Sequence, residues 1–233
     1  PADLYLANLL MGTYVIEEAR RRATPKTVVL GTICSYPKLT PVPFKESDLW
    51  AGYPEETNAP YGIAKKALHV QLAAYRHEYG LLGIYLLPTN LYGPRDNFDP
   101  ETSHVIPALI RRLLEAKETG AEELVVWGTG QPSREFLYVD DCARALLLAA
   151  EHHDGVDPVN VGIGVEIRIA ELVTLIAELV GYEGRFVYDT SQPDGQPRRC
   201  LDTSKALSLF GFRARVHMRE GLERTVEWYL AQR

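Results

Sequence analysis

Cysteine is scarce in this sequence, and its three copies lie far apart. Cys34, Cys142 and Cys200 form neither a disulfide framework nor a CxxC metal pattern, so each is either a small buried residue or a reactive thiol. Asp140 and Asp141 look like a metal pair at first sight, but adjacent side chains point apart and no third ligand is spaced nearby. We therefore assign no metal and expect a helix to start there, because its dipole favours carboxylates.

Long apolar runs, a leader and an excess of positive charge are also missing. No run approaches the roughly 20 apolar residues of a membrane span, and the opening PADLYLANLL lacks a cationic start and a cleavage pattern. We therefore expect a cytoplasmic protein without a membrane partner. Lys and Arg number 25 against 31 Asp and Glu, a net charge of -6, which disfavours a nucleic-acid partner. Local arginines can still hold a small anion.

Apolar residues recur at helical or strand spacing along most of the chain. We predict helices over residues 3–22, 61–79 and 169–180, and strands over residues 27–32, 83–89, 124–128, 136–141, 158–162 and 185–189. A further helix follows residue 141, and two short amphipathic helices close the chain. Strands that alternate with helices imply parallel pairing and an α/β fold, in which the first strand is buried on both faces. The proline-rich stretch 37–60 is a candidate functional loop.

The segment Tyr61-Gly-Ile-Ala-Lys65 carries the clearest chemical signal. Four residues on a helix bring two side chains to one face, and an ammonium beside a phenol favours the phenolate, which suits acid/base catalysis. Alone the pattern is weak, because a solvated lysine beside a packing tyrosine has the same spacing. Thr32 and Cys34 strengthen it, since they lie at the end of the first strand, where open α/β sheets bind ligands.

Six segments, in this order, resemble the GDP-L-fucose synthase family of extended short-chain dehydrogenases/reductases: GTICSYPK, NAPYGIAKKA, PTNLYGPRDNF, SHVIPALIRR, VVWGTG and REFLYVDD. The resemblance implies a Rossmann-like doubly wound parallel sheet with a smaller C-terminal α/β substrate lobe. It also implies NADPH as cofactor, a GDP-sugar as substrate and a homodimer. In the implied reaction, C3 and C5 of GDP-4-keto-6-deoxy-mannose are epimerised and the C4 ketone is then reduced.

The resemblance also implies the catalytic roles. Tyr61 donates a proton to the C4 oxygen, and Lys65 holds Tyr61 and the nicotinamide ribose. Thr32 stands where the family usually has serine and keeps the hydroxyl that bonds the ketone oxygen. Cys34 and His104 match the pair that moves protons at C3 and C5, and both side chains can titrate near neutrality. A packed strand cysteine, and a histidine at a helix start capped by the preceding serine, are the structural alternatives.

The ligand contacts follow from the same resemblance. The cofactor-binding residues are Tyr61, Lys65, Pro88, Thr89, Asn90, Leu91 and His104, and the substrate-binding residues are Asn90, Val105, Leu109, Arg112, Trp127, Arg134 and Arg198. Arg112 and Arg134 suit a diphosphate, whereas Val105, Leu109 and Trp127 suit a flat guanine. A core position for the tryptophan and solvated arginines are the alternatives.

One part of the family's pattern is missing. Members begin with a strand, a GxxGxxG turn and a helix that holds the pyrophosphate, and no such glycine spacing precedes residue 31. We therefore expect a Rossmann domain at residues 1–165, truncated at its N-terminal half, with a substrate-lobe insertion around 92–135 and a C-terminal lobe at 166–233. The first strand would be an uncovered edge, so we expect a fragile chain: a shortened piece, an ordered remnant or a fragment completed by another copy.

Two other functions stay open. One is another extended reductase, epimerase or dehydratase that uses a different nucleotide sugar, such as a relative of UDP-galactose 4-epimerase. A pure 4-epimerase would need no proton transfer at C3 or C5. A non-catalytic nucleotide-sugar-binding module fits the missing glycine loop, but it does not explain the intact Tyr61, Lys65, Cys34 and His104.

Overall fold

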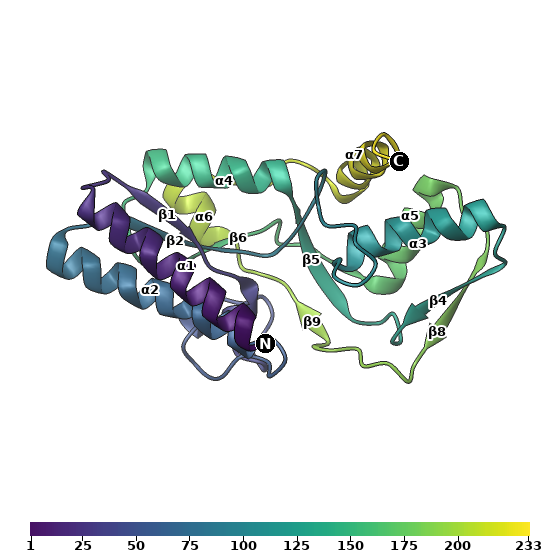
Figure 1. Ribbon diagram of the computed structural model, residues 1–233, viewed down its shortest axis with the longest axis horizontal. Helices are drawn as coiled ribbons and strands as arrows, with labels where there is room; N and C mark the ends of the chain where they lie inside the picture. The colour runs from purple at the N-terminus through teal and green to yellow at the C-terminus, as the bar shows by residue number, and fades with distance from the viewer. The chain divides into compact units, whose positions relative to one another are not determined.

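The computed structural model describes residues 1–233 and divides them into two compact units (Figure 1). Unit 1 consists of Pro1–Asn90, Asp141–Gly164 and Cys200–Ala214, and unit 2 consists of Leu91–Asp140, Val165–Arg199 and Arg215–Arg233. The chain therefore crosses between the units more than once. The segment from residue 200 to 214 lies in unit 1, although the sequence had suggested the C-terminal lobe for it.

Helices and strands alternate along most of the chain. The α-helices are α1 (Ala2–Arg21), α2 (Ala59–Tyr79), α3 (Val105–Thr119), α4 (Val139–His152), α5 (Ile169–Val180), α6 (Ser204–Phe210) and α7 (Met218–Leu230). The strands are β1 (Thr27–Leu30), β2 (Gly83–Pro88), β3 (Asn90–Tyr92), β4 (Glu123–Trp127), β5 (Ser133–Tyr138), β6 (Val159–Val161), β7 (Glu166–Arg168), β8 (Arg185–Asp189) and β9 (Arg198–Arg199). Two 3-10 helices, η1 (Ile33–Ser35) and η2 (Glu46–Asp48), complete the fold. No α-helix combines the length and apolar character needed to cross a bilayer.

A parallel sheet of order β1–β2–β6 forms the centre of unit 1. All six residues of β2 are buried, because this strand has a neighbour on each side. The four residues of β1 are only half-buried, so the prediction of a first strand buried on both faces is wrong. The reason is its position, since an edge strand has a neighbour on one side only.

Helices α1 and α2 lie against each other on one face of this sheet, and α4 and α6 lie on the other (Figure 1). Gly12 permits the close approach of the first pair, because a Cβ there would stand 2.3 Å from Cδ1 of Leu68. Ile16, Leu72 and Tyr85 belong to the hydrophobic core between these helices and the sheet. This core fixes α2 relative to the strand ends where the candidate site lies.

The proline-rich loop is fastened to unit 1 by buried polar side chains. Lys66, which is 4% exposed, donates to the carbonyl of Leu49 at 2.7 Å. Asn160 of β6 donates to the carbonyl of Phe44 at 2.9 Å and accepts from the hydroxyl of Tyr36 at 2.6 Å. Because these groups are buried and paired, the loop is an ordered part of the unit.

Unit 2 has its own core, to which α3, α5 and α7 contribute. Strands β4 and β8 pair in parallel, whereas β5 pairs antiparallel with β7. The antiparallel pair departs from the parallel pairing expected from the alternation. Between β5 and β7 the chain passes through unit 1, so no helical crossover within unit 2 dictates a parallel arrangement. Helix α4 also begins at residue 139, where the sequence had suggested that the preceding strand continues.

Candidate active site

Thr32 and Cys34 lie at the carboxyl end of β1, beside the carboxyl end of β2. The register pairs Leu30 with Leu86, and the backbone N–H of Gly31 donates to the Leu86 carbonyl at 2.7 Å. Thr32 then caps η1, with its Oγ1 accepting from the backbone N–H of Cys34 at 3.2 Å. The cysteine is half-buried and forms no disulfide. One short turn therefore holds both the hydroxyl and the thiol at the ligand-binding edge of the sheet.

Tyr61 and Lys65 lie near the start of α2. The helix begins at Ala59 with Pro60 in its first turn, where a proline is tolerated. The side chain of Thr32 lies close enough to the Tyr61 hydroxyl to lower its pKa, and Nζ of Lys65 lies 5.7 Å from the centre of the Tyr61 ring. The structure thus brings together three of the residues selected from the sequence.

A glycine allows α2 to approach the turn that bears the thiol. A Cβ at Gly62 would stand 2.4 Å from the carbonyl oxygen of Cys34, and Oγ of Ser35 donates to the Gly62 carbonyl at 3.1 Å. These contacts were not foreseen from the sequence, although a glycine in the first turns of a helix is a signal of close backbone approach.

The pKa of Tyr61 is raised, not lowered. Burial is the main cause, the neighbouring Cys34 adds to it, and the side chain of Thr32 opposes it. The expectation that Lys65 favours the phenolate is therefore wrong for this structure, because its ammonium makes no hydrogen bond to the phenol and has a pKa that burial lowers. The phenol keeps its proton at neutral pH, which suits a proton donor.

The loop after β2 forms the neighbouring edge of the sheet. Thr89 follows Pro88, is 4% exposed, and donates its backbone N–H to the carbonyl of Val161 at 3.0 Å. Asn90 is half-buried, and Leu91, the first residue of unit 2, is 36% exposed. The rigid backbone at Thr89 presents the last two of these side chains as candidate ligand contacts.

Lys65 is the group in unit 1 that best fits a nicotinamide cofactor. Its ammonium is half-buried, and burial is the only cause that shifts its pKa, with no carboxylate acting on it. An ammonium without a carboxylate partner keeps its donors for neutral oxygens. Lys65 and Tyr61 therefore suit the hydroxyls of a ribose.

His104, Val105 and Leu109 lie at the start of α3 in unit 2. His104 is the exposed N-cap residue and its side chain makes no capping hydrogen bond. The expected cap, Ser103, has a buried Oγ without a partner. Val105 is 36% exposed, whereas Leu109 is 4% exposed and belongs to the core of unit 2. The leucine therefore offers little surface to a guanine, and the valine offers more.

Arg112 lies beside β4. Its Nη2 donates to the carbonyl of Val125 at 2.5 Å, and burial lowers the pKa of its guanidinium. Val125 and Trp127 lie on the exposed face of the strand, and 70% of the tryptophan surface is accessible. Trp127 is therefore not a core residue, and a guanidinium lies next to a flat apolar surface.

Arginines gather where β5 pairs with β9. The register places Arg134 opposite Arg199, and burial, followed by the charge of Arg199, lowers the pKa of Arg134 to about 10. Arg198 is exposed and forms an ion pair with Glu166. Two neighbouring guanidinium groups favour an anion, so Arg199 is a stronger candidate than Arg198. The sequence could not distinguish them, because adjacent strand residues face opposite sides and the strand partner was unknown.

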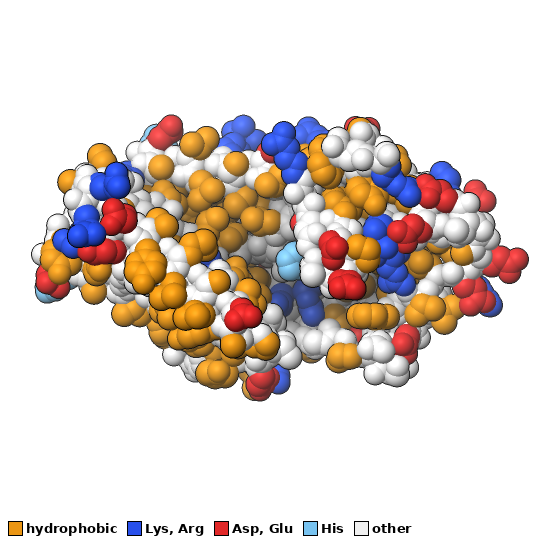
Figure 2. All heavy atoms as spheres, in the orientation of Figure 1, with side chains coloured by type: hydrophobic (Ala, Val, Ile, Leu, Met, Phe, Trp, Pro, Cys, Tyr) orange, Lys and Arg blue, Asp and Glu red, His pale blue; other side chains and the backbone are white.

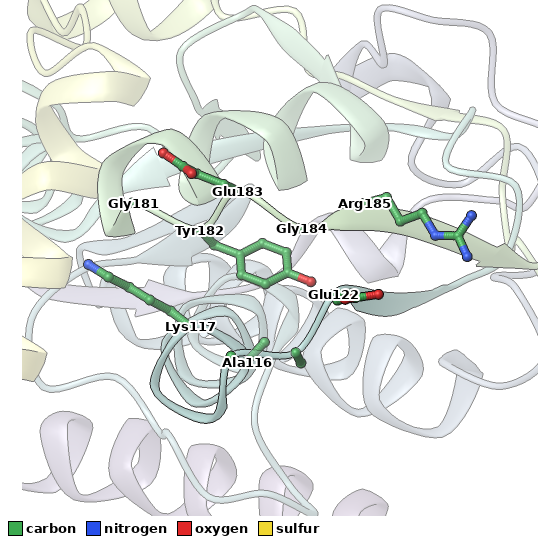
Figure 3. A pocket seen from close by; sticks show the side chains of 10 residues that line it. Ala116, Lys117, Glu122, Gly181, Tyr182, Glu183, Gly184 and Arg185 are labelled. Atoms are coloured by element: carbon green, nitrogen blue, oxygen red, sulfur yellow. The ribbon is translucent and has the colours of Figure 1, made fainter.

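A hollow of about 550 Å³ in unit 2 lies away from these residues (Figure 3). It is formed where α3 and α5 end and β4 and β8 begin, and Figure 3 shows Tyr182 between Lys117 and Glu122. Trp127 lies at the opposite end of β4. The hollow is therefore separate from the end of β4 that carries Trp127.

Known proteins resemble this chain over almost its whole length. The NAD dependent epimerase/dehydratase family matches residues 1–164. GDP-L-fucose synthase 1 of Arabidopsis thaliana is 49% identical over 230 residues, covering 99% of this chain and 71% of the relative. Probable GDP-L-fucose synthase 1 of Oryza sativa subsp. japonica is 48% identical over 231 residues, covering 99% and 70%. A GDP-L-fucose synthetase of Naegleria fowleri bound to NADP has a TM-score of 0.93 at 29% identity, covering 99% and 74%.

These comparisons confirm the resemblance found in the six segments and the Rossmann-like α/β fold. The matched region contains the strand ends and the helix that carry Thr32, Cys34, Tyr61 and Lys65. The chain belongs to the NAD dependent epimerase/dehydratase family.

Proposed function

We propose that this chain is an NADPH-dependent epimerase-reductase that converts GDP-4-keto-6-deoxy-mannose to GDP-L-fucose. The observation that carries the proposal is the proximity of the Thr32 side chain to the Tyr61 hydroxyl, on the same short turn as the Cys34 thiol. A proton donor, a second hydroxyl and a thiol are the groups that a keto-sugar needs for reduction and for inversion beside its ketone. The names and identities of the plant relatives support the choice of sugar.

Cys34 and His104 are the proposed proton carriers of the epimerisation. C3 and C5 both flank the C4 ketone, so loss of a proton from either carbon gives an enolate. Hydrogen bonds from Thr32 and Tyr61 stabilise the enolate oxygen. One carrier removes the proton from the carbon, and the other returns a proton to the opposite face, which inverts the centre.

The reduction uses the same hydroxyls. NADPH supplies the hydride for C4 when it is bound. Lys65 holds the nicotinamide ribose together with Tyr61, and the loop from Pro88 to Leu91 lines the cofactor. Tyr61 gives its proton to the C4 oxygen while Thr32 keeps that oxygen oriented. The raised pKa of the tyrosine favours this step, because the phenol is still protonated at neutral pH.

The nucleotide contacts lie on unit 2. Arg112, Arg134 and Arg199 are proposed to hold the diphosphate, since guanidinium groups bind phosphate oxygens in pairs. Trp127 and Val105 are proposed to cover the guanine. The sequence also selected Asn90, Leu109 and Arg198; of these, the leucine is packed in the core and Arg198 is neutralised by Glu166, which makes both weaker contacts.

A second copy of the chain is the proposed partner of α1. Apolar side chains gather over this helix (Figure 2), and Leu6, Met11 and Tyr14 are each more than half exposed. Residues 4–16 contain no charged side chain. An uncharged apolar face can match itself across a two-fold axis, as homodimer interfaces do. Replacing Met11 with Glu is expected to turn a dimer into a monomer in light scattering, and an unchanged mass would reject this interface.

We further propose that the reaction takes place in the cytoplasm. None of the three cysteines forms a disulfide, and a reducing compartment preserves thiols.

The function is tested by product analysis. The protein that carries this chain is incubated with NADPH and GDP-4-keto-6-deoxy-mannose, and in parallel with the corresponding UDP-keto-sugar. We expect GDP-L-fucose by NMR, with one NADPH oxidised for each sugar. Conversion of the UDP-sugar alone would assign a different reaction of the family.

A further inference from the structure

A buried tyrosine lies beneath the catalytic turn, which we define as residues 61–65 of α2. Tyr85 of β2 has a relative exposure of 0%, and its hydroxyl donates to the backbone carbonyl of Lys65 at 2.8 Å. The contact comes from the sheet side of the helix, through the core. Tyr85 therefore touches the catalytic turn from a position that a substrate does not reach.

Ser35 connects this tyrosine with the segment that bears the other reacting groups. Its side chain is fully buried, and Oγ donates to the carbonyl of Gly62 at 3.1 Å. The Ser35 side chain also lies close enough to the Tyr85 hydroxyl to influence its pKa. Because Ser35 closes the turn that contains Thr32 and Cys34, its hydroxyl joins that turn to the catalytic turn, and the Tyr85 hydroxyl holds the catalytic turn from β2.

Gly31 leaves the space that Tyr85 occupies. A Cβ at Gly31 would stand 2.4 Å from the tyrosine oxygen, so a side chain there would displace the phenol. Burying a phenol without a hydrogen-bond acceptor costs folding free energy, and here the Lys65 carbonyl accepts the hydrogen bond of the Tyr85 hydroxyl. Gly31 therefore leaves room for the Tyr85 phenol, and the Lys65 carbonyl supplies its hydrogen-bond acceptor.

The helix does not need these hydroxyls for its own hydrogen bonds. Carbonyls inside an α-helix already accept from the N–H four residues ahead, and residues 62 and 65 lie inside α2. The bonds from Ser35 and Tyr85 are additional. Their effect is to fix the position of the catalytic turn relative to Thr32.

We infer that Tyr85 and Ser35 are positioning residues, which hold the catalytic turn so that the Tyr61 hydroxyl meets Thr32. The inference rests on the proposed function, in which Tyr61 is the proton donor. A displacement of about 1 Å at a reacting group can cost a hundredfold in rate. Loss of one of the two tethers is expected to lower kcat for ketone reduction roughly tenfold. KM for the GDP-sugar should stay nearly constant, because neither residue touches it.

Tyr85→Phe tests the inference, because it removes the hydroxyl and keeps the ring in the core. Tyr75→Phe is the matched control, since Tyr75 lies on α2 and its hydroxyl ties this helix to Glu17 of α1 with a bond of 2.9 Å. Each variant loses one tyrosine hydrogen bond of the same helix. We expect kcat to fall in Tyr85→Phe and to stay within twofold of the wild type in Tyr75→Phe. Equal kcat values in the two variants would overturn the inference.

A titration of Tyr61 provides a readout that needs neither substrate nor cofactor. The Cζ signal of Tyr61 is followed by NMR against pH and assigned with Tyr61→Phe. Because the Thr32 side chain lowers the pKa of Tyr61, moving the two groups apart should move the midpoint upward. We expect this in Tyr85→Phe and in Ser35→Ala, but not in Tyr75→Phe.

The two failures can be told apart. If the wild type converts no GDP-keto-sugar, the proposed function fails, while the NMR titration still decides the positioning role. An unchanged Tyr61 midpoint in both Tyr85→Phe and Ser35→Ala would overturn the inference, whatever the activity.

Discussion

The side chain of Thr32, which follows strand β1, lies close enough to the hydroxyl of Tyr61, on helix α2, to lower the pKa of that phenol. Two segments far apart in the sequence therefore place their hydroxyls at one point at the edge of the parallel sheet. Both hydroxyls can reach the oxygen of one ketone, and the predictions below follow from that relationship.

Replacing Tyr61 with Phe should stop the reduction while sparing the proton exchange. Loss of a general acid costs about a thousandfold in rate, so NADPH oxidation should fall by that order. Thr32 and Cys34 are unchanged, so deuterium from solvent should still enter the keto-sugar. Stopped-flow absorbance of NADPH and NMR of the sugar measure the two steps. A reduction rate within tenfold of the wild type would contradict the assignment of Tyr61.

The rate of reduction should depend on pH only in alkaline solution. A free tyrosine titrates near about 10, and burial raises the pKa of Tyr61 above its ordinary value. The donor works in its protonated form, so kcat should be flat from about pH 7 to 9 and should fall only above about pH 10. An alkaline limb centred below about pH 9 would show that another group limits the reaction.

Cys34→Ser and His104→Gln should separate epimerisation from reduction. Each variant lacks one proton carrier, so deuterium incorporation at C3 and C5 should fall about a hundredfold or more. Reduction of a keto-sugar that is already epimerised should continue, because Tyr61 and Lys65 are intact. Undiminished exchange in both variants would reject their roles.

Arg134→Gln and Arg199→Gln should weaken the binding of GDP. Burial and the charge of Arg199 lower the pKa of Arg134 to about 10, so Arg134 is still protonated at neutral pH. A bound diphosphate would relieve the repulsion between the two cations. Calorimetry should show about a tenfold loss of affinity for each variant. Arg219→Gln is the control, because Arg219 is exposed and paired with Glu178 at 2.6 Å; an equal loss in the control would argue against an anion site.

Asn160→Ala should destabilise unit 1 strongly. Its side-chain amide donates to the carbonyls of Phe44 and Asp202 and accepts from Tyr36, all within 3.1 Å. The substitution leaves the Tyr36 hydroxyl without this acceptor and removes the amide donor from both carbonyls, although the Phe44 carbonyl still accepts from the backbone N–H of Asp202. The free energy of unfolding should fall by about 3 kcal/mol. Denaturant unfolding measures the change. Asn8→Ala, at an exposed site, should cost less than about 0.5 kcal/mol, and a similar loss in both variants would contradict this account.

Periodicity was sufficient to predict the main elements. Leu6, Leu9 and Ile16 recur at helical spacing in α1, and the continuous apolar run of β2 indicates a strand buried on both faces, as it is. Such patterns are local, because each lies within one short segment of the chain. The half-burial of β1 could not be predicted from its sequence, because an edge strand and a central strand can have the same kind of apolar run.

The catalytic turn was predicted only in part. The spacing of Tyr61 and Lys65 placed both on one face of a helix, but the sign of the Tyr61 pKa shift depends on burial, which a motif does not contain. Tyr85 was not selected from the sequence because it lies in an ordinary apolar strand. The role of its hydroxyl depends on the hydrogen bond to the Lys65 carbonyl, which only the structure shows. Arg199 was missed because its neighbour on β5 is a long-range partner.

The most direct test of the account is the conversion of GDP-4-keto-6-deoxy-mannose with NADPH in heavy water. Thiol- and imidazole-mediated inversion predicts GDP-L-fucose with deuterium at both C3 and C5. A reduced product that carries no deuterium at either carbon would contradict the roles of Cys34 and His104, and with them the assignment as an epimerase-reductase.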